Sequence, residues 1–238
     1  MIAKEELKQI EDYLLLYKIP LDILLEVKDH MSTQIAEIQA EKEITFEKAF
    51  TETKLAWEND LKPTHFTMYT TDEIPMIVKK MVKAKYWDLF KKSILLASLS
   101  LCLHLIFVFI SNDVKTYSVF FRIQNGIFVI LPIIVWLSHL KMRKYIKYDF
   151  KFRGKSFYTI YQQNVGLLLT SSGLMAQVAV RDGSFLYNYL QGSEHSHLIG
   201  FLMTLVIPIV LQIIVSFAIF NFIKHKQTLN KIQNNVVE

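Results

Sequence analysis

The sequence predicts an all-α membrane protein, with a small N-terminal helical bundle followed by a four-helix transmembrane region. Three observations predict this fold class. The first 62 residues repeat apolar side chains at helical spacing, long uncharged apolar runs follow residue 92, and Lys and Arg cluster between alternate runs. The expected parts are a three-helix domain (1–62), a connector with a juxtamembrane helix (63–92), a four-span region (93–223) and a tail (224–238).

The spacing of apolar residues in the N-terminal domain predicts three amphipathic helices. Pro20 separates the first from the second, and the polar stretch 41–44 separates the second from the third. Thr45 is a suitable N-cap for the third helix, and Pro63 ends it. Because each helix carries one apolar face, the three should pack together, with Trp57 as a large core side chain.

The connector 62–75 is polar and rich in Thr. A juxtamembrane helix is expected to start at about Thr71 and to run into the first span. Pro75 would then lie in its first turn, where proline is tolerated.

Four apolar stretches are candidates for membrane spans, since a bilayer core needs about 20 mainly apolar residues in a helix. They cover residues 93–111, 123–140, about 160–180 and 198–223. The third is the weakest, because three consecutive polar residues begin at Gln162. Its alternative is a re-entrant or surface helix.

The basic residues predict the direction of threading. Six Lys lie in 79–92, seven Lys or Arg lie in 141–155, and the tail adds more. The positive-inside rule then places both termini and the 141–155 loop in the cytoplasm. The remaining two connections hold only Lys115, Arg122 and Arg181.

Charge differs sharply between the two parts of the chain. Residues 1–62 carry 8 Lys against 14 Asp or Glu, whereas residues 63–238 carry 19 Lys or Arg against 8 acids. The basic residues flank apolar runs, so a lipid bilayer is the expected partner and nucleic acid is not. The single cysteine, Cys102, excludes an intrachain disulfide and a Cys-rich zinc site.

Glu26, Asp29 and His30 form the first candidate site. At spacings of three and four residues their side chains share one helical face. One interpretation is structural or solvated, with His30 bonded to Glu26 or to a neighbouring helix. The alternatives are contact with a cytoplasmic protein partner and, with fewer matching ligands, a metal ion.

The N-terminal pattern resembles the HAAS or permease-prefix family, a small helical domain of bacterial membrane proteins. The residues that carry the resemblance are Leu21–His30, Thr45–Phe50, Trp57 and Leu61, within about residues 5–62. The resemblance implies a regulatory or protein-contacting cytoplasmic module, near a transcription regulator or a permease, and no catalytic residue. The chain departs from the family in having no glycine in 41–44 and no long permease region.

His104, Gln177 and Gln212 form a second candidate, a polar site inside the membrane. Intramembrane ionisable residues are functional candidates by default, and these three could line a path for a solute. The alternative is hydrogen bonding between packed helices. In the outer loop, Glu194, His195 and His197 could bind a transition metal loosely or simply face water.

Small residues on the third stretch favour close approach of another span or of a second copy, which makes a homo-oligomer an option. No nucleotide-binding, zinc-protease or hydrolase motif occurs, and neither a cofactor nor a metal is expected. The sequence therefore predicts a non-enzymatic integral membrane protein that regulates or scaffolds through its cytoplasmic domain. The alternative is a small oligomeric transporter or channel for an unidentified solute.

Overall fold

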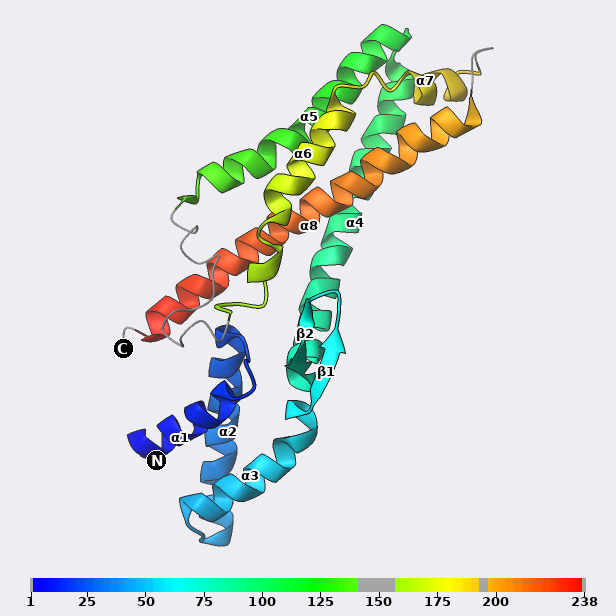
Figure 1. Cartoon of the computed structure of the whole chain (residues 1–238). Helices are drawn as coiled ribbons and strands as arrows, with labels where there is room; N and C mark the ends of the chain where they lie inside the picture. The colour runs from blue at the N-terminus through cyan, green and yellow to red at the C-terminus, as the bar shows by residue number, and fades with distance from the viewer. Residues whose placement is uncertain (1, 141–156, 193–196, 237–238) are drawn as a thin grey trace. The chain divides into compact units, whose positions relative to one another are not determined.

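The computed structural model describes residues 2–140, 157–192 and 197–236. The chain is all-α apart from one β-hairpin, and it divides into two compact units (Figure 1). The helical unit contains the chain up to Tyr86, the segment 157–163 and the chain from His225 onward. The apolar unit contains the rest.

Three helices form the core of the helical unit, as the sequence predicts. They are α1 (Lys4–Leu15), α2 (Leu21–Lys42) and α3 (Phe46–Leu61). Each buries the apolar face that its periodicity indicates. The buried side chains are Ile10 and Leu14 from α1, Ile23, Leu24, Val27, Met31 and Ile35 from α2, and Phe46, Ala49 and Phe50 from α3.

Trp57 is only half-buried, so the prediction that it fills the core is wrong. Its indole Nε1 donates a hydrogen bond to Oε1 of Gln34, at 2.9 Å. An indole N–H needs a partner, and a position at the edge of the α2–α3 interface supplies one. The aromatic contribution to the core comes from Phe46 and Phe50, whose rings stack with centroids 5.4 Å apart.

The connector forms an antiparallel hairpin of β1 (Pro63–Phe66) and β2 (Thr70–Pro75). The juxtamembrane helix therefore does not start at Thr71, because that residue lies in β2. Helix α4 (Met76–Ile110) begins directly after Pro75. Since proline offers no N–H to a strand partner, it is suited to a strand end, and here Pro63 and Pro75 face each other at the open end of the hairpin.

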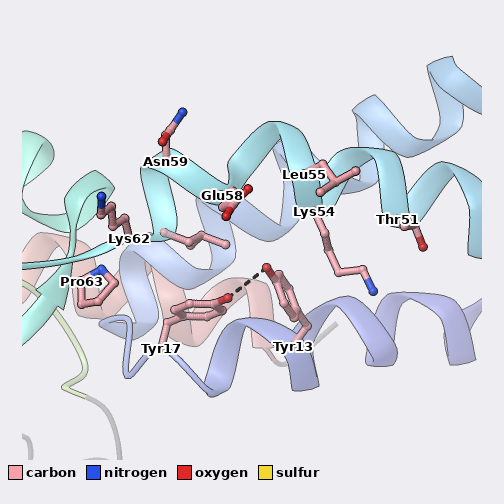
Figure 2. A pocket seen from close by; sticks show the side chains of 10 residues that line it. Tyr13, Tyr17, Thr51, Lys54, Leu55, Glu58, Asn59, Lys62 and Pro63 are labelled. Carbon is pink, nitrogen blue, oxygen red and sulfur yellow. Dashed lines mark hydrogen bonds between the residues drawn. The ribbon is translucent and has the colours of Figure 1, made fainter.

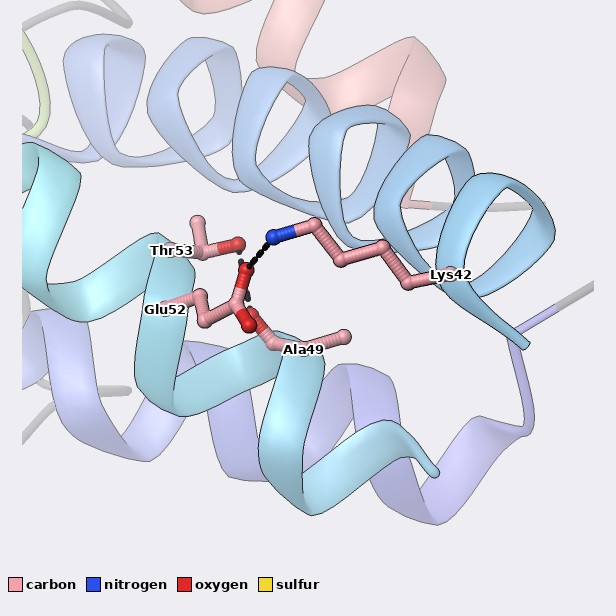
Figure 3. A network of polar contacts seen from close by, with 4 residues as sticks. All are labelled: Lys42, Ala49, Glu52 and Thr53. Atoms are coloured by element: carbon pink, nitrogen blue, oxygen red, sulfur yellow. Dashed lines mark hydrogen bonds and ion pairs between the residues drawn. The ribbon is translucent and has the colours of Figure 1, made fainter. Parts of the chain in front are cut away.

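The α2–α3 connection is tight and contains a residue of unusual backbone geometry. Glu43 has φ of 53° and caps α2 in the left-handed region. Beside it, Lys42 Nζ lies 2.6 Å from Oε2 of Glu52, and the buried Thr53 hydroxyl donates to the carbonyl of Ala49 (Figure 3). The ion pair is exposed, so its contribution to stability is at most about 1 kcal/mol.

Glu43→Gly is expected to stabilise the α2–α3 connection. A left-handed conformation costs an L-residue about 1–2 kcal/mol, whereas glycine adopts it freely and loses about 0.5–1 kcal/mol of chain entropy. The net gain in the free energy of local opening is up to about 1 kcal/mol, measured by hydrogen exchange of the amides around residues 40–46. Glu41→Gly, inside α2, should have the opposite sign. Equal changes in both variants would contradict the interpretation.

The apolar unit is built from long helices. These are most of α4, then α5 (Val114–Leu137), α6 (Leu167–Ala179), α7 (Ser184–Leu190) and the first two-thirds of α8 (Leu198–Val236). Three of them, α4, α5 and α8, are long and apolar enough to cross a membrane. Within this unit, α6 lies alongside α5 and leads the chain to α7 (Figure 1).

The predicted four-helix transmembrane region is not confirmed, since the weak third stretch gives a short helix. Gln162–Asn164 form a 3₁₀ turn, and α6 has only 13 residues. At 1.5 Å per residue, α6 is about 20 Å long, against a hydrocarbon core of about 30 Å. Polar side chains at the start of this stretch divert the backbone, so the helix begins at Leu167.

Aromatic and aliphatic side chains fill the centre of the apolar unit. The Tyr117 ring is fully buried and stacks on the Tyr187 ring, with centroids 5.6 Å apart. Tyr187 in turn donates a hydrogen bond to the carbonyl of Ser111, which fixes α7 against the end of α4. The buried cluster consists of Val108, Tyr117, Phe121, Phe128, Met175, Val178, Leu186 and Val215.

Candidate functional site

An open cleft lies between α1 and α3 in the helical unit (Figure 2). Its volume is about 490 Å³. Tyr13 projects from the last turn of α1 and Tyr17 from the turn that follows it, and both line the cleft opposite Lys54, Leu55 and Glu58 on α3. The turn after Leu15 keeps Tyr17 beside Tyr13, because the Tyr17 N–H donates to the carbonyl of Leu14. The cleft therefore has an aromatic wall opposite a mixed polar and apolar wall.

The aromatic wall is ordered by contacts between side chains. The Tyr17 hydroxyl donates to the Tyr13 hydroxyl at 3.1 Å, and the Tyr13 ring meets Phe50 edge-to-face at 5.8 Å. Burial and the Tyr17 hydroxyl raise the pKa of Tyr13 above its usual range, so the phenol stays neutral. Lys54 Nζ lies 4.5 Å from the centroid of the Phe50 ring, a cation–π distance.

Several polar groups at the cleft are available to a ligand. Within the described residues, Lys54 forms no salt bridge, and the side chains of Glu58 and Asn59 form no hydrogen bond. Leu55 is 66% exposed at the same place. An exposed apolar side chain beside aromatic rings and unused donors and acceptors is the composition of a protein-contact site.

A second site lies at the start of α2, where Asp22 holds a segment far along the chain. The Ile160 N–H donates to Asp22 Oδ2 at 3.3 Å, while the backbone N–H groups of Leu21 and Asp22 donate to the carbonyls of Phe157 and Tyr158. Asp22 Oδ1 is enclosed and has no hydrogen-bond partner in the described part of the chain. Burial raises the pKa of Asp22 to about 7, although Lys85 opposes the shift.

The same segment is held from its other side by α4 and α8. The Tyr86 hydroxyl donates to the carbonyl of Ile160 at 2.7 Å, and Thr159 Oγ1 lies 2.8 Å from His225 Nδ1. Residues 157–163 thus connect three parts of the helical unit that are distant in the sequence. Asp22 and His225 are two ionisable side chains that bond to this segment.

Glu26, Asp29 and His30 lie on the exposed side of α2, and none of them lines the cleft. The structure contains no hydrogen bond between His30 and Glu26; the Asp29 carbonyl accepts from the hydroxyls of Ser32 and Thr33. Contact of these three residues with a partner stays a prediction. Among residues 2–140, 157–192 and 197–236, no cluster of three His, Cys, Asp or Glu side chains could hold a metal ion. Glu194 and His195 lie outside the described residues, as does the basic loop 141–155.

The three polar residues predicted for the membrane interior have different surroundings. Gln212 Nε2 donates to Oδ1 of Asn125 at 3.0 Å, and both are buried. His104 is buried against the Phe121 ring, with centroids 5.2 Å apart. Gln177 is exposed on α6. The structure shows no hydrogen bond that joins any two of the three. Neither His104 nor Gln212 lines the cleft between α1 and α3.

Other polar side chains of the apolar unit also bond internally. Gln124 Nε2 donates to the carbonyl and hydroxyl of Ser100, each at 2.6 Å, and Ser172 donates to the carbonyl of Val129. Such bonds between helices stabilise packing in a medium without water.

Neither the cleft between α1 and α3 nor the Asp22 junction was predicted from the sequence. The spacing of Tyr13 and Tyr17 is visible in the sequence, but it does not show that both line a cleft. Asp22 was visible as a first-turn acid, and no local pattern links it to Ile160. Comparisons with protein-family models, curated proteins and solved structures gave no match to the chain. The resemblance to the permease-prefix family stays a prediction.

Proposed function

We propose that this protein is a non-enzymatic, four-pass protein of the bacterial cytoplasmic membrane that regulates or scaffolds a cytoplasmic protein. In this proposal α4, α5, α8 and the stretch containing α6 cross the bilayer. Both termini and the helical unit then face the cytoplasm. The charge distribution along the sequence supports this direction of threading.

The observation that carries the proposal is the open cleft between α1 and α3. Its exposed Leu55, its tyrosine wall and its unused polar groups form a surface that a folded domain ordinarily covers when it binds another protein. The ligand we propose is a segment of a cytoplasmic protein that places an apolar side chain against Leu55 and Tyr17. Its polar groups would bond to Lys54 and Glu58.

The apolar unit supports the regulatory proposal over a transporter or channel. Gln124 and Gln212 are engaged in hydrogen bonds between helices, and aromatic and aliphatic side chains fill the centre. A solute path would need these polar groups to face a continuous opening.

The cleft is tested by site-specific photocrosslinking in the native membrane. A photoreactive amino acid at Leu55 is expected to give one discrete protein adduct, and the adduct should disappear when Tyr17→Asp is added. The matched control is the same label at Leu16, which is 78% exposed but lies outside the cleft. Equal adducts from both positions, or an adduct that survives Tyr17→Asp, would contradict a specific site.

A further inference from the structure

A second hollow, of about 670 Å³, lies in the apolar unit between α6, α7 and α8. One wall is the outer face of α6, with Leu174 and Gln177, and the other is the first half of α8, from Gly200 to Leu211. The ring of Phe121 forms part of its floor. We call this hollow the α6–α8 groove. Its walls are mainly apolar, and they belong to two segments that the proposed topology places in the membrane.

Local sequence explains why the groove stays open. At Gly200, an added Cβ would lie 2.6 Å from the Phe185 ring, so a side chain there would close the groove at this end. Pro208 lies inside α8 and has no N–H to donate to the carbonyl of Thr204, four residues earlier. Thr204 and Pro208 both line the groove. The groove therefore carries polar backbone and hydroxyl groups within an apolar wall.

The rim of the groove is cationic. Arg122 and Arg181 line it together with Asp182, which gives two positive charges and one negative charge. Arg122 Nε donates to the Arg181 carbonyl at 3.3 Å, and within the described residues neither guanidinium forms a salt bridge. Asp182 accepts hydrogen bonds from the backbone N–H and the hydroxyl of Ser184. These hydrogen bonds, together with the nearby charge of Arg122, hold the pKa of Asp182 below its usual range. One acid facing two guanidinium groups leaves the rim with a net positive charge.

The positions of these arginines are unusual for the chain. Cationic residues cluster in 79–92 and 141–155, whereas the two connections at the other end hold only three. Two of these three, Arg122 and Arg181, line the groove, and Lys115 does not. An arginine fork binds phosphate through several N–H groups. Because the rim carries two positive charges and one negative charge, it favours a phosphodiester whose head group has no positive charge of its own.

We propose that the α6–α8 groove binds an anionic phospholipid, with an acyl chain along the groove and the phosphate between Arg122 and Arg181. The hydrocarbon would contact Leu174, Met203 and Ile207, and the head group would lie at the rim. This rests on the proposed membrane location of α6 and α8, and it is independent of the cytoplasmic partner. The lipid would hold α6, which is too short to span the core alone, against α8.

The test uses the full-length protein in phosphatidylcholine liposomes containing a trace of photoactivatable phosphatidylglycerol. In the wild type, crosslinks are expected in peptides that contain 174–182 and 200–211. Unlabelled phosphatidylglycerol should displace the probe, whereas phosphatidylcholine and soluble glycerol phosphate should not. Crosslinks spread evenly over the lipid-facing helices, or equal competition by phosphatidylcholine, would overturn the proposal. Competition by glycerol phosphate at the same concentration would assign the rim to a soluble anion instead.

Variants separate the groove from general surface charge. Arg122→Gln and Arg181→Gln should each weaken phosphatidylglycerol binding by at least about tenfold, the effect of losing a charge-assisted hydrogen bond to the phosphate. Lys115→Gln is the matched control, since it removes a cation at the same end of the unit but outside the groove, and its binding should be unchanged. An equal loss in Lys115→Gln would reject the site.

Should an arginine variant fail to fold, the wild-type crosslinking map and competition decide the question alone. If accessibility labelling contradicts the four-pass topology, crosslinks confined to the groove would still support lipid binding. The two proposals can therefore be rejected independently.

Discussion

Gly183→Ala is expected to lower the free energy of unfolding of the apolar unit by about 2–5 kcal/mol. Gly183 has φ of +69°, and an added Cβ would lie 2.7 Å from two atoms of the Phe121 ring. The left-handed conformation costs an L-residue about 1–2 kcal/mol, and overpacking a core costs about 1–3 kcal/mol more. Phe121 is 1% exposed within the buried cluster, so its ring cannot move aside freely.

Gly192→Ala separates the two contributions. Gly192 has φ of +68°, but none of the described residues lies within 4 Å of an added Cβ. We therefore expect only the conformational cost, about 1–2 kcal/mol. Thermal unfolding of the full chain in one detergent, followed by near-ultraviolet circular dichroism, measures both variants. Adding Phe121→Leu should recover part of the loss in Gly183→Ala and none in Gly192→Ala. Equal losses in the two glycine variants would show that Phe121 does not constrain Gly183.

Raising the pH from about 4 to about 7 is expected to loosen the segment 157–163 from the start of α2. The pKa of Asp22 is raised from 3.8 to about 7 in the folded state by burial. The docked state therefore keeps a proton that the undocked state loses, and its stability falls as pH rises through this window. The stabilisation of the docked state by protonated Asp22 is complete below about pH 4 and is lost above about pH 7. We expect Asp22 to contribute about 2–4 kcal/mol, with the lower figure allowing for partial solvent exposure. His225 bonds to Thr159 in the same segment, and burial lowers the pKa of its imidazole to about 4, so it contributes with the opposite sign up to about pH 6.5. The net loosening is therefore smaller than the contribution of Asp22.

The measurement is hydrogen exchange of the Ile160 amide, which donates to Asp22 Oδ2. After correction for intrinsic exchange, protection of the wild type should fall relative to that of Asp22→Asn as pH rises from 5 to 8, because the asparagine amide oxygen accepts the same bond and does not titrate. Asp29→Asn, on the exposed side of α2, is the control and should behave as the wild type. The same pH dependence in the wild type and in Asp22→Asn would assign the effect to another group, such as His225, which bonds to Thr159.

Local patterns in the sequence predict the three N-terminal helices well. The 3.6-residue spacing of apolar side chains between Leu7 and Leu61 places all three helices, and Pro20 and Pro63 mark two of their limits. These features are local, so one sequence suffices to read them. Trp57 was misplaced because a helical face predicts burial without predicting a partner for the indole N–H.

The hairpin and the third stretch show where local patterns fail. Thr64, Thr70 and Thr71 are β-branched, and Pro63 and Pro75 bracket them, which is a strand signal that the polar composition obscured. In the third stretch, hydropathy alone could not show that the chain turns at Gln162 before α6 begins.

The Asp22 junction and the α6–α8 groove depend on tertiary contacts, which the sequence does not display. Asp22 and Ile160 are 138 residues apart, and their contact depends on the path of the chain between them. The groove arises because α6 packs on α5 through Leu168, Ser172 and Met175 and leaves its other face uncovered. Periodicity identifies the buried face of α6, but it does not identify the helix that α6 packs against.

The direction in which the chain crosses the membrane is the central claim, because it places the cleft in the cytoplasm and the arginine rim on the opposite side. Replacing Cys102 by Ser permits single cysteines at Asn112, Asn188, Thr67 and Lys226. A membrane-impermeant maleimide applied to intact cells is expected to label positions 112 and 188, and to reach 67 and 226 only after permeabilisation. Labelling of 226 but not 188 in intact cells would show that the α6 stretch does not cross, and would contradict the four-pass account.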